Sequence, residues 1–440
     1  MTQRRGRSFG ANVLISFAFT GLLTALAFTN SIVIARWVGA EGRGLYALGV
    51  AVLGVLIPLT NLGLGFASTW AIGRGESIPR VVSLNHLWSA VVLLICSTLV
   101  GGALLRFQGV PEVEWALVGL VALITLPAAV YSENARGVML GLGQVVRYNG
   151  VQTLQVIALL IANLTLLGIG PQAVLLTLVI GYWVPAFIVL LGHVPKLAEA
   201  SWPPKELRKS QVGYGVKATG THLVEILIIR LDYLLVTPII GVAALGLYSV
   251  ADQIATVLAW GGLVAGRMML AESSSDRAGD AARWKLGLGV RTLLLVVGVA
   301  AIFAASTGWY IIPTVFGEEF APAYIGLLIL LPAAQLRGST ALIGTYLMGR
   351  SVLRPVLIAG AAAIAVIAVG SPIAAHFFGW RGVAVVRVIA YAVQLVLTAR
   401  AYRQATGESF RWILDRDDVN ALAAWARLRL AKRRGSSDSE

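Results

Sequence analysis

The sequence predicts an all-α integral membrane protein with about twelve transmembrane helices in two six-helix lobes, with both termini in the cytoplasm. The composition indicates the class, since hydrophobic residues make up 58% of the 440 positions and charged residues only 13%, far from the usual mix of a soluble domain. Two sequence anchors that recur six spans apart indicate the two lobes. An uneven distribution of Lys and Arg indicates the orientation.

The individual spans follow from long intervals without charge, because a helix needs about 20 mainly apolar residues to cross the hydrocarbon core. No charge falls between Arg7 and Arg36, or between Arg43 and Arg74. With boundaries placed at Pro, Gly and charge clusters, the expected spans are 9–35, 45–72, 84–105, 116–140, 149–169, 172–192, 212–236, 243–266, 289–313, 322–347, 353–375 and 382–402. The fifth and sixth are linked only by GIGPQA, which predicts a tight helical hairpin.

The first span has some features of a signal peptide. It follows MTQRR and contains an Ala-x-Ala triplet at Ala25 and Ala27. Its apolar core is longer than a signal peptide has, and its counterpart in the second half lies in mid-chain. We therefore expect it to remain as a transmembrane helix, with cleavage as the alternative.

The basic residues are expected on the cytoplasmic side of the membrane. With the N-terminus inside, 27 of the 35 Lys and Arg residues fall in cytoplasmic connections and span ends, and only four in external ones. This bias predicts that both termini lie inside and supports an even number of spans. It also accounts for the net charge of +14, so that a nucleic-acid partner is not expected.

An internal repeat relates the two halves. GAEGRGLYALG at 39–49 aligns with GVAALGLYSVA at 241–251, an offset of 202, and LPAA occurs at 126–129 and again at 331–334, an offset of 205. Six spans separate the copies, so the halves are parallel repeats about an axis along the membrane normal. Glycine permits a tight reversal between helices, and the tyrosine is expected near the external interface.

The repeat divides the chain into lobes at 1–192 and 212–402, with a Pro-rich, charged cytoplasmic linker at 193–211. In the polar tail at 403–440, VNALAAWARLRLAKRR predicts a basic amphipathic helix on anionic membrane lipid. A solvated basic tail is the alternative.

The chain resembles the polysaccharide flippases of the multidrug, oligosaccharidyl-lipid and polysaccharide exporter superfamily. The resemblance rests on ARWVGAEGRGLYALGVAVLGVLIPLTNLGLG at 35–65, ENARGVMLGLGQVVRYN at 133–149 and IIRLDYLLVTPIIGVAALGLYSVADQIA at 228–255. It implies two six-helix bundles around a central cleft that opens alternately to each side. It also implies flipping of undecaprenyl-diphosphate-linked oligosaccharide across the cell (inner) membrane, with a polysaccharide polymerase and other assembly proteins as partners.

Charges within the seventh span are candidates for function, because burying an ionisable group in hydrocarbon is costly. Lys217, Thr221, Glu225 and Asp232 fall within about 80° of a helical wheel, and Arg230 points nearly opposite Asp232. Lys217 and Thr221 are expected to bind the substrate's diphosphate, Glu225 to couple transport to protons, and Asp232 to act as a gate or cation partner. Pairing with groups on neighbouring helices is the structural alternative.

Other candidates lie in the remaining spans. Arg337 in the tenth span and Arg36 at the end of the first suit phosphate contacts, although snorkelling to the interface is an equal alternative for Arg36. Asn30, the repeat equivalent of Asp232, and Asp252, which closes the second copy of the turn, join the candidates for ion coupling and gating. Glu133 and Arg136 are spaced to pair with one another, and Arg387 stays unassigned.

Several classes of chemistry are not expected. Cys96 is the single cysteine, the four histidines are scattered, and no phosphate-binding Gly-x-x-x-x-Gly-Lys loop occurs, so we expect no disulfide, metal site, cofactor or direct use of ATP. A membrane glycosyltransferase or polymerase is the alternative from another class, but the external loops are short and hold few carboxylates. A lipid II flippase or a cation-coupled drug exporter of the same superfamily is a closer alternative.

Overall fold

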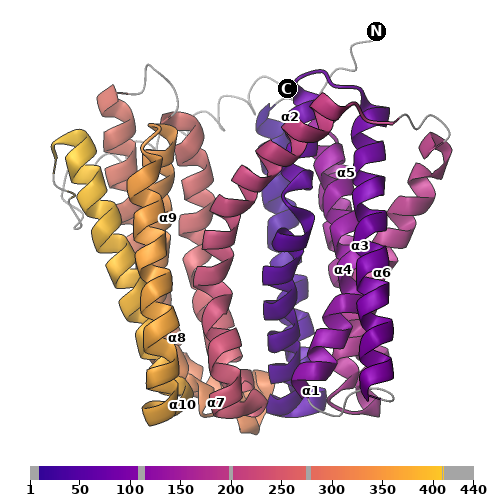
Figure 1. Cartoon of the computed structure of the whole chain (residues 1–440). Coiled ribbons are helices and arrows are strands. Elements are labelled where there is room, and N and C mark those ends of the chain that lie inside the picture. The colour runs from indigo at the N-terminus through magenta and orange to yellow at the C-terminus, as the bar shows by residue number, and fades with distance from the viewer. Residues whose placement is uncertain (1–8, 108–113, 198–201, 274–278, 409, 411–440) are drawn as a thin grey trace, which may run out of the picture. The chain divides into compact units, whose positions relative to one another are not determined.

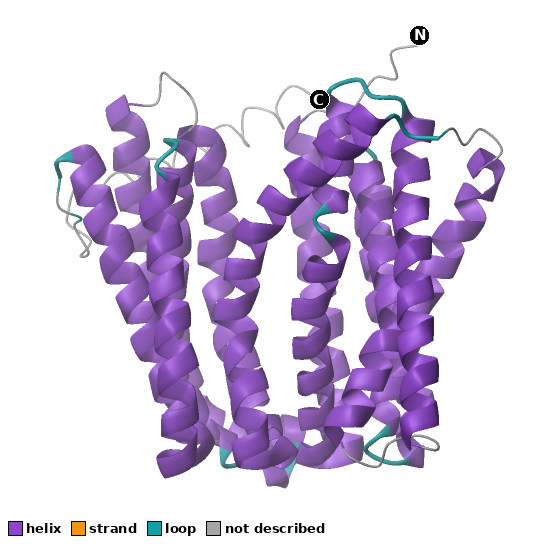
Figure 2. Ribbon diagram, viewed as in Figure 1, coloured by secondary structure: helices purple, strands orange, loops and turns teal. Residues whose placement is uncertain are grey.

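The computed structural model describes residues 9–107, 114–197, 202–273, 279–408 and 410. These residues form α-helices joined by short turns and contain no β-strand (Figure 2). The helices, labelled in Figure 1, are α1 (Phe9–Asn61), α2 (Leu64–Gly73), α3 (Ile78–Phe107), α4 (Glu114–Gly141), α5 (Val145–Leu166), α6 (Ala173–Leu197), α7 (Lys205–Ser273), α8 (Gly279–Phe316), α9 (Ala323–Gly349) and α10 (Leu353–Thr406), with 3-10 turns η1 (Leu167–Ile169) and η2 (Glu318–Phe320).

Nine helices in the described part of the chain are long and apolar enough to cross a membrane. The helix α2, with 10 residues, is not among them. It follows a break at Leu62 and Gly63, both with positive φ, so the expected span at 45–72 is interrupted before its end. The amphipathic segment predicted in the tail lies outside the described residues.

Three of the nine helices contain a glycine with non-helical dihedral angles: Gly39 in α1 (φ 64°), Gly241 in α7 (φ 77°) and Gly379 in α10 (φ 59°). A positive φ is accessible to glycine at little cost because glycine has no Cβ. These positions separate the expected first and second, seventh and eighth, and eleventh and twelfth spans. A single residue therefore stands where a longer loop would otherwise be needed.

The chain reverses direction at these glycines. Residues 16 positions apart are about 24 Å apart along a straight helix, yet the Asn30 amide donates to the Tyr46 hydroxyl at 3.3 Å across Gly39. Across Gly241, the Tyr248 hydroxyl donates to Asp232 Oδ2 at 2.5 Å over the same separation. Both α1 and α7 are therefore helical hairpins, as the sequence predicts for the glycine-rich turn.

The same two hydrogen bonds show that the internal repeat of the sequence is also present in the structure. Asn30 and Tyr46 become Asp232 and Tyr248 on adding the offset of 202, so equivalent side chains meet in both hairpins. Tyr248 is fully buried within the protein, and the expected position of the tyrosine near the external interface stays a prediction. Its hydroxyl holds the hairpin together instead of reaching water.

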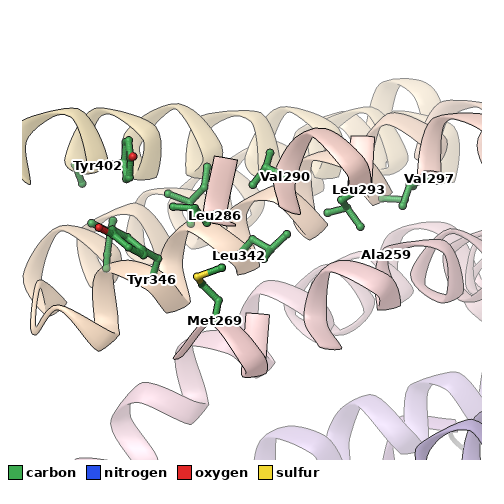
Figure 3. Packing of buried hydrophobic residues seen from close by; sticks show 13 residues of the cluster. Ala259, Met269, Leu286, Val290, Leu293, Val297, Leu342, Tyr346 and Tyr402 are labelled. Carbon is green, nitrogen blue, oxygen red and sulfur yellow. The ribbon is translucent and has the colours of Figure 1, made fainter. Parts of the chain in front are cut away.

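The chain divides into two compact units, and each is described by itself. The first comprises Met1–Ala251, Tyr310–Gly326 and Ile367–Val383, and the second comprises Asp252–Trp309, Leu327–Val366 and Ala384–Glu440. The second unit has a core of packed apolar side chains from α7, α8, α9 and α10, shown in Figure 3. Leu286, Val290 and Leu342 are almost completely buried in it, and Tyr346 packs beside Tyr402.

Candidate functional site

The charged face of α7 is accessible along one part of its length and closed at another. Lys217 and Glu225 are exposed, whereas Asp232 is fully buried. Glu225 and Asp232 are seven residues apart and point within about 20° of one another, so the difference does not arise from facing different ways. The surroundings of α7 change within two helical turns. The Thr221 side chain lies outside the described residues.

Asp232 is held by donors within the hairpin of α7. Its Oδ2 accepts from Tyr248 and its Oδ1 accepts from the backbone N–H of Tyr233 at 2.9 Å. The rings of Tyr233 and Tyr248 meet edge to face at 5.5 Å, which covers the carboxylate with apolar surface. Such donors offset the cost of burying a carboxylate. Asp232, which the sequence predicts as a gating residue, therefore joins the two segments of the α7 hairpin by hydrogen bonding.

Asn30 occupies the equivalent position in α1 with a neutral side chain. It is buried, donates to Tyr46, and its Oδ1 accepts from the Asn163 amide of α5 at 2.7 Å. The first half therefore anchors its hairpin through amides, and only the second half places an ionisable group at this point.

The two hairpins cross at a pair of glycines within the first unit. A Cβ built on Gly44 would lie 2.6 Å from the carbonyl carbon of Val242, and one on Gly246 would lie 2.8 Å from that of Ala40. Adding the repeat offset of 202 turns one contact into the other, as expected about a two-fold axis. We call Ala40, Gly44, Val242 and Gly246 the glycine seal. No other residue type fits at positions 44 and 246 without separating the helices.

A carboxylate and a guanidinium flank the glycine seal. Glu319 in η2 accepts from the backbone N–H of Ala40 at 2.7 Å. Arg36 donates from Nε to the carbonyl of Val315 at 2.9 Å and from its guanidinium to the carbonyl of Thr314. These carbonyls belong to the C-terminal end of α8, the negative end of the helix dipole. Arg36 therefore caps α8, a role that neither expectation for it included.

The second unit contains a buried ion pair and a separate arginine. Asp252 and Arg387, 7% and 1% exposed, pair across α7 and α10. The sequence placed Asp252 among the gating candidates and left its partner unassigned. Arg337 in α9 is half-buried and forms no ion pair with any described residue. The predicted pair of Glu133 and Arg136 is confirmed in the first unit.

Neither the described residues nor the sequence indicates a metal centre. No group of three or more His, Cys, Asp and Glu side chains in the described part of the chain could hold a metal ion. Cys96 is a buried free thiol.

Comparison with protein families shows to which family the chain belongs. The family model described as polysaccharide biosynthesis protein matches residues 9–264, more than half of the chain. The chain belongs to this family. No curated protein matches the sequence.

Solved structures show what fold this family member has. It is similar to the lipid II flippase MurJ in an inward closed conformation, with a TM-score of 0.70 at 12% identity, covering 89% of this chain and 87% of that one. An inward-facing multidrug resistance MATE family transporter of the MOP superfamily gives a TM-score of 0.65 at 13% identity, covering 88% and 94%. The MATE multidrug transporter DinF-BH gives 0.58 at 17% identity, covering 92% and 99%. The chain therefore has the same fold as these flippase and transporter structures.

The region matched by the family model contains most of the candidate residues. It spans α1 to the second segment of α7 and so includes the glycine seal, Lys217, Glu225 and Asp232. Arg337 and Glu319 lie beyond it. In the sequence, Glu319 is simply one of the few external carboxylates, and Gly44 and Gly246 belong to glycine-rich turns. Their roles could not be predicted, because a close approach between distant helices leaves no local signal.

Proposed function

We propose that this protein flips undecaprenyl-diphosphate-linked oligosaccharide from the inner to the outer leaflet of the cell membrane by alternating access. The family match supports a role in polysaccharide biosynthesis, and the fold supports transport. The observation that carries the mechanism is the charged face of α7, exposed at Glu225 and buried at Asp232 beside the glycine seal. A transport path for a charged substrate must be open to one side of the membrane while it is closed to the other.

The proposed topology has twelve crossings. Each of the three helices with a non-helical glycine contributes two of the crossings, and each of the other six long helices contributes one. The excess of basic residues places both termini in the cytoplasm and the Gly39 end outside. In this orientation the glycine seal closes the external side, and Lys217 and Glu225 are reached from the cytoplasm.

The exposed charges of α7 take the chemical roles in this proposal. Lys217, with Thr221 one turn further on, attracts the diphosphate, and Arg337 offers a planar guanidinium suited to two phosphate oxygens. Glu225, an exposed carboxylate on the same face of α7, couples the cycle to protons.

The gating roles are divided between the hairpins. Asp232 and Asn30 hold the hairpins in the closed arrangement, and Arg36 and Glu319 fasten the external side. Asp252 acts through its pairing with Arg387. Opening to the outside must separate the glycine seal and release Glu319 from Ala40.

The superfamily also contains lipid II flippases and cation-coupled drug exporters, and these two functions are the alternatives to the proposed one. The family match favours the polysaccharide branch over both. A glycosyltransferase or polymerase is disfavoured, because the structural relatives are a flippase and a transporter. Polymerases belong to this proposal only as assembly partners of the flippase.

Loss of the protein tests the function directly. Deleting its gene should cause lipid-linked oligosaccharides to accumulate on the cytoplasmic side of the membrane, and the wild-type gene should restore their export. Accumulation of lipid II instead would assign the chain to peptidoglycan assembly. Normal distribution of both lipids would refute the proposal.

A further inference from the structure

A cationic pocket lies within the second unit. It has a volume of about 330 Å³ and is lined by Arg283 of α8, by Tyr346, Leu347, Arg350 and Val352 around the end of α9, and by Ala405 and Thr406 at the end of α10. This volume is at the lower end of the range of small-molecule sites, about 300–1,000 Å³. The pocket therefore has room for a head group, not for an oligosaccharide.

The charge in the pocket is positive. Arg283 pairs with Glu408 at 3.2 Å, and Glu408 is 60% exposed, so this carboxylate can be displaced into water. Arg350 is exposed and has no ion pair with any described residue. The described residues that line the pocket include two arginines and no carboxylate. They favour an anion with several oxygens, and phosphate matches the planar fork of arginine.

Backbone geometry fixes Arg350 at the pocket's rim. The turn between α9 and α10 holds Ser351 at φ 61°, a left-handed conformation that is uncommon for a residue other than glycine. Within this turn the Val352 N–H donates to the Leu347 carbonyl at 2.9 Å. The turn thereby sets one cation and two apolar side chains side by side in the same pocket.

The surroundings of the pocket resemble a membrane interface. Trp284, next to Arg283, is 51% exposed, and Leu353, next to Val352, is 49% exposed. Exposed Lys285 and Arg354 stand beside them. Tryptophan is enriched at the level of lipid head groups, and basic pockets between transmembrane helices bind anionic lipids. The ligand should therefore join a phosphate to hydrocarbon chains.

We propose that this pocket binds the head group of an anionic phospholipid, with the phosphate between Arg283 and Arg350 and the acyl chains along Trp284 and Leu353. None of its residues has a part in the proposed transport mechanism, so the proposal does not depend on the identity of the transported lipid. On binding, the phosphate replaces Glu408 at Arg283, so Glu408 competes with the ligand.

Binding to the purified full-length protein in detergent tests the proposal. The dissociation constant of short-chain phosphatidylglycerol should rise about tenfold in R283Q and in R350Q, because each variant loses a charge-assisted hydrogen bond. R350K should fall between R350Q and the wild type. R400Q removes an exposed arginine of α10 that does not line the pocket, and it should stay within twofold of the wild type.

A variant with the opposite effect separates binding from damage to the fold. E408Q removes the competing carboxylate and should tighten phosphatidylglycerol binding two- to fivefold, which a misfolded protein cannot do. Zwitterionic phosphatidylcholine should bind at least tenfold more weakly than phosphatidylglycerol.

Three results would overturn the assignment: unchanged binding in both R283Q and R350Q, equal binding of the two phospholipids, or tighter binding of a polyprenyl diphosphate that the same variants abolish. None of these readouts uses transport, so failure of this site leaves the proposed function untouched, and the reverse also holds.

Discussion

Replacing Gly246 by alanine should prevent the glycine seal from closing. The new Cβ would lie 2.8 Å from the carbonyl carbon of Ala40, 0.6 Å short of the 3.4 Å at which ordinary van der Waals contact begins, and closer still to its oxygen. The neighbouring atoms are backbone, which cannot rotate away. Overpacking of this kind costs about 1–3 kcal/mol. The closed state should therefore lose roughly 5- to 150-fold in population relative to the open one.

Accessibility of the seal measures this shift. In a Cys96→Ala background, Val242→Cys places a thiol within the seal, where the wild-type residue is buried. A membrane-impermeant maleimide added outside should label this thiol at least about fivefold faster when Gly246→Ala is present. Export of lipid-linked oligosaccharide should fall in the same variant, because a transporter held open to one side cannot complete its cycle.

A glycine on the same helix provides the matched control. A Cβ on Gly220 meets nothing within 4 Å, so Gly220→Ala gains the same helix propensity without the clash. It should label and transport like the wild type. Gly44→Ala, whose Cβ would overlap the backbone of Val242, should behave like Gly246→Ala. If Gly246→Ala transports normally and labels no faster than Gly220→Ala, the seal is not a gate.

Four further changes probe the remaining candidates. Glu225→Gln should abolish export or uncouple it from protons, as measured by complementation of a flippase-deficient strain. Arg337→Ala should lower export while the amount of protein in the membrane stays the same. Tyr248→Phe leaves the buried carboxylate beside it without its hydroxyl donor and should destabilise the protein by about 1–3 kcal/mol in thermal unfolding. Arg387→Met should cost about 3–5 kcal/mol because it removes the guanidinium that pairs with the buried Asp252, and adding Asp252→Leu should recover much of that loss.

Controls for these variants come from the same elements. Glu206→Gln in the first turn of α7 should export normally, and full activity of Glu225→Gln would remove proton coupling from that residue. Arg400→Ala should leave export unchanged, and normal export by Arg337→Ala would remove that residue from the path. Tyr46→Phe should cost less than Tyr248→Phe, since its partner is a neutral amide at 3.3 Å; equal costs would contradict the argument from charge. If Arg387→Met with Asp252→Leu is no more stable than Arg387→Met alone, the loss of stability does not come from the buried Asp252 carboxylate.

Local sequence was sufficient for most of the helices and for their reversals, but not for the break at Leu62 and Gly63 within the expected span at 45–72. Hydropathy sets where helices lie in a membrane chain, and the helices and their breaks fall close to the expected spans. The glycine-rich turns at Gly39 and Gly241 could be predicted because positive φ is a property of one residue and its neighbours. The pairing of Glu133 with Arg136 could be predicted for the same reason, since three residues along a helix set the spacing.

Only the tertiary structure decided which side chains meet across the fold. Gly44 and Gly246 look like turn residues in sequence, but they are required where two helices some 200 positions apart cross without room for a Cβ. Arg36 caps a helix that begins more than 200 residues later, Arg387 proves to be the partner of Asp252, and Glu225 and Asp232 share a helical face yet differ in burial. Periodicity states which way a side chain points along its own helix. What it points at depends on a second helix, and that information exists only once the helices have packed.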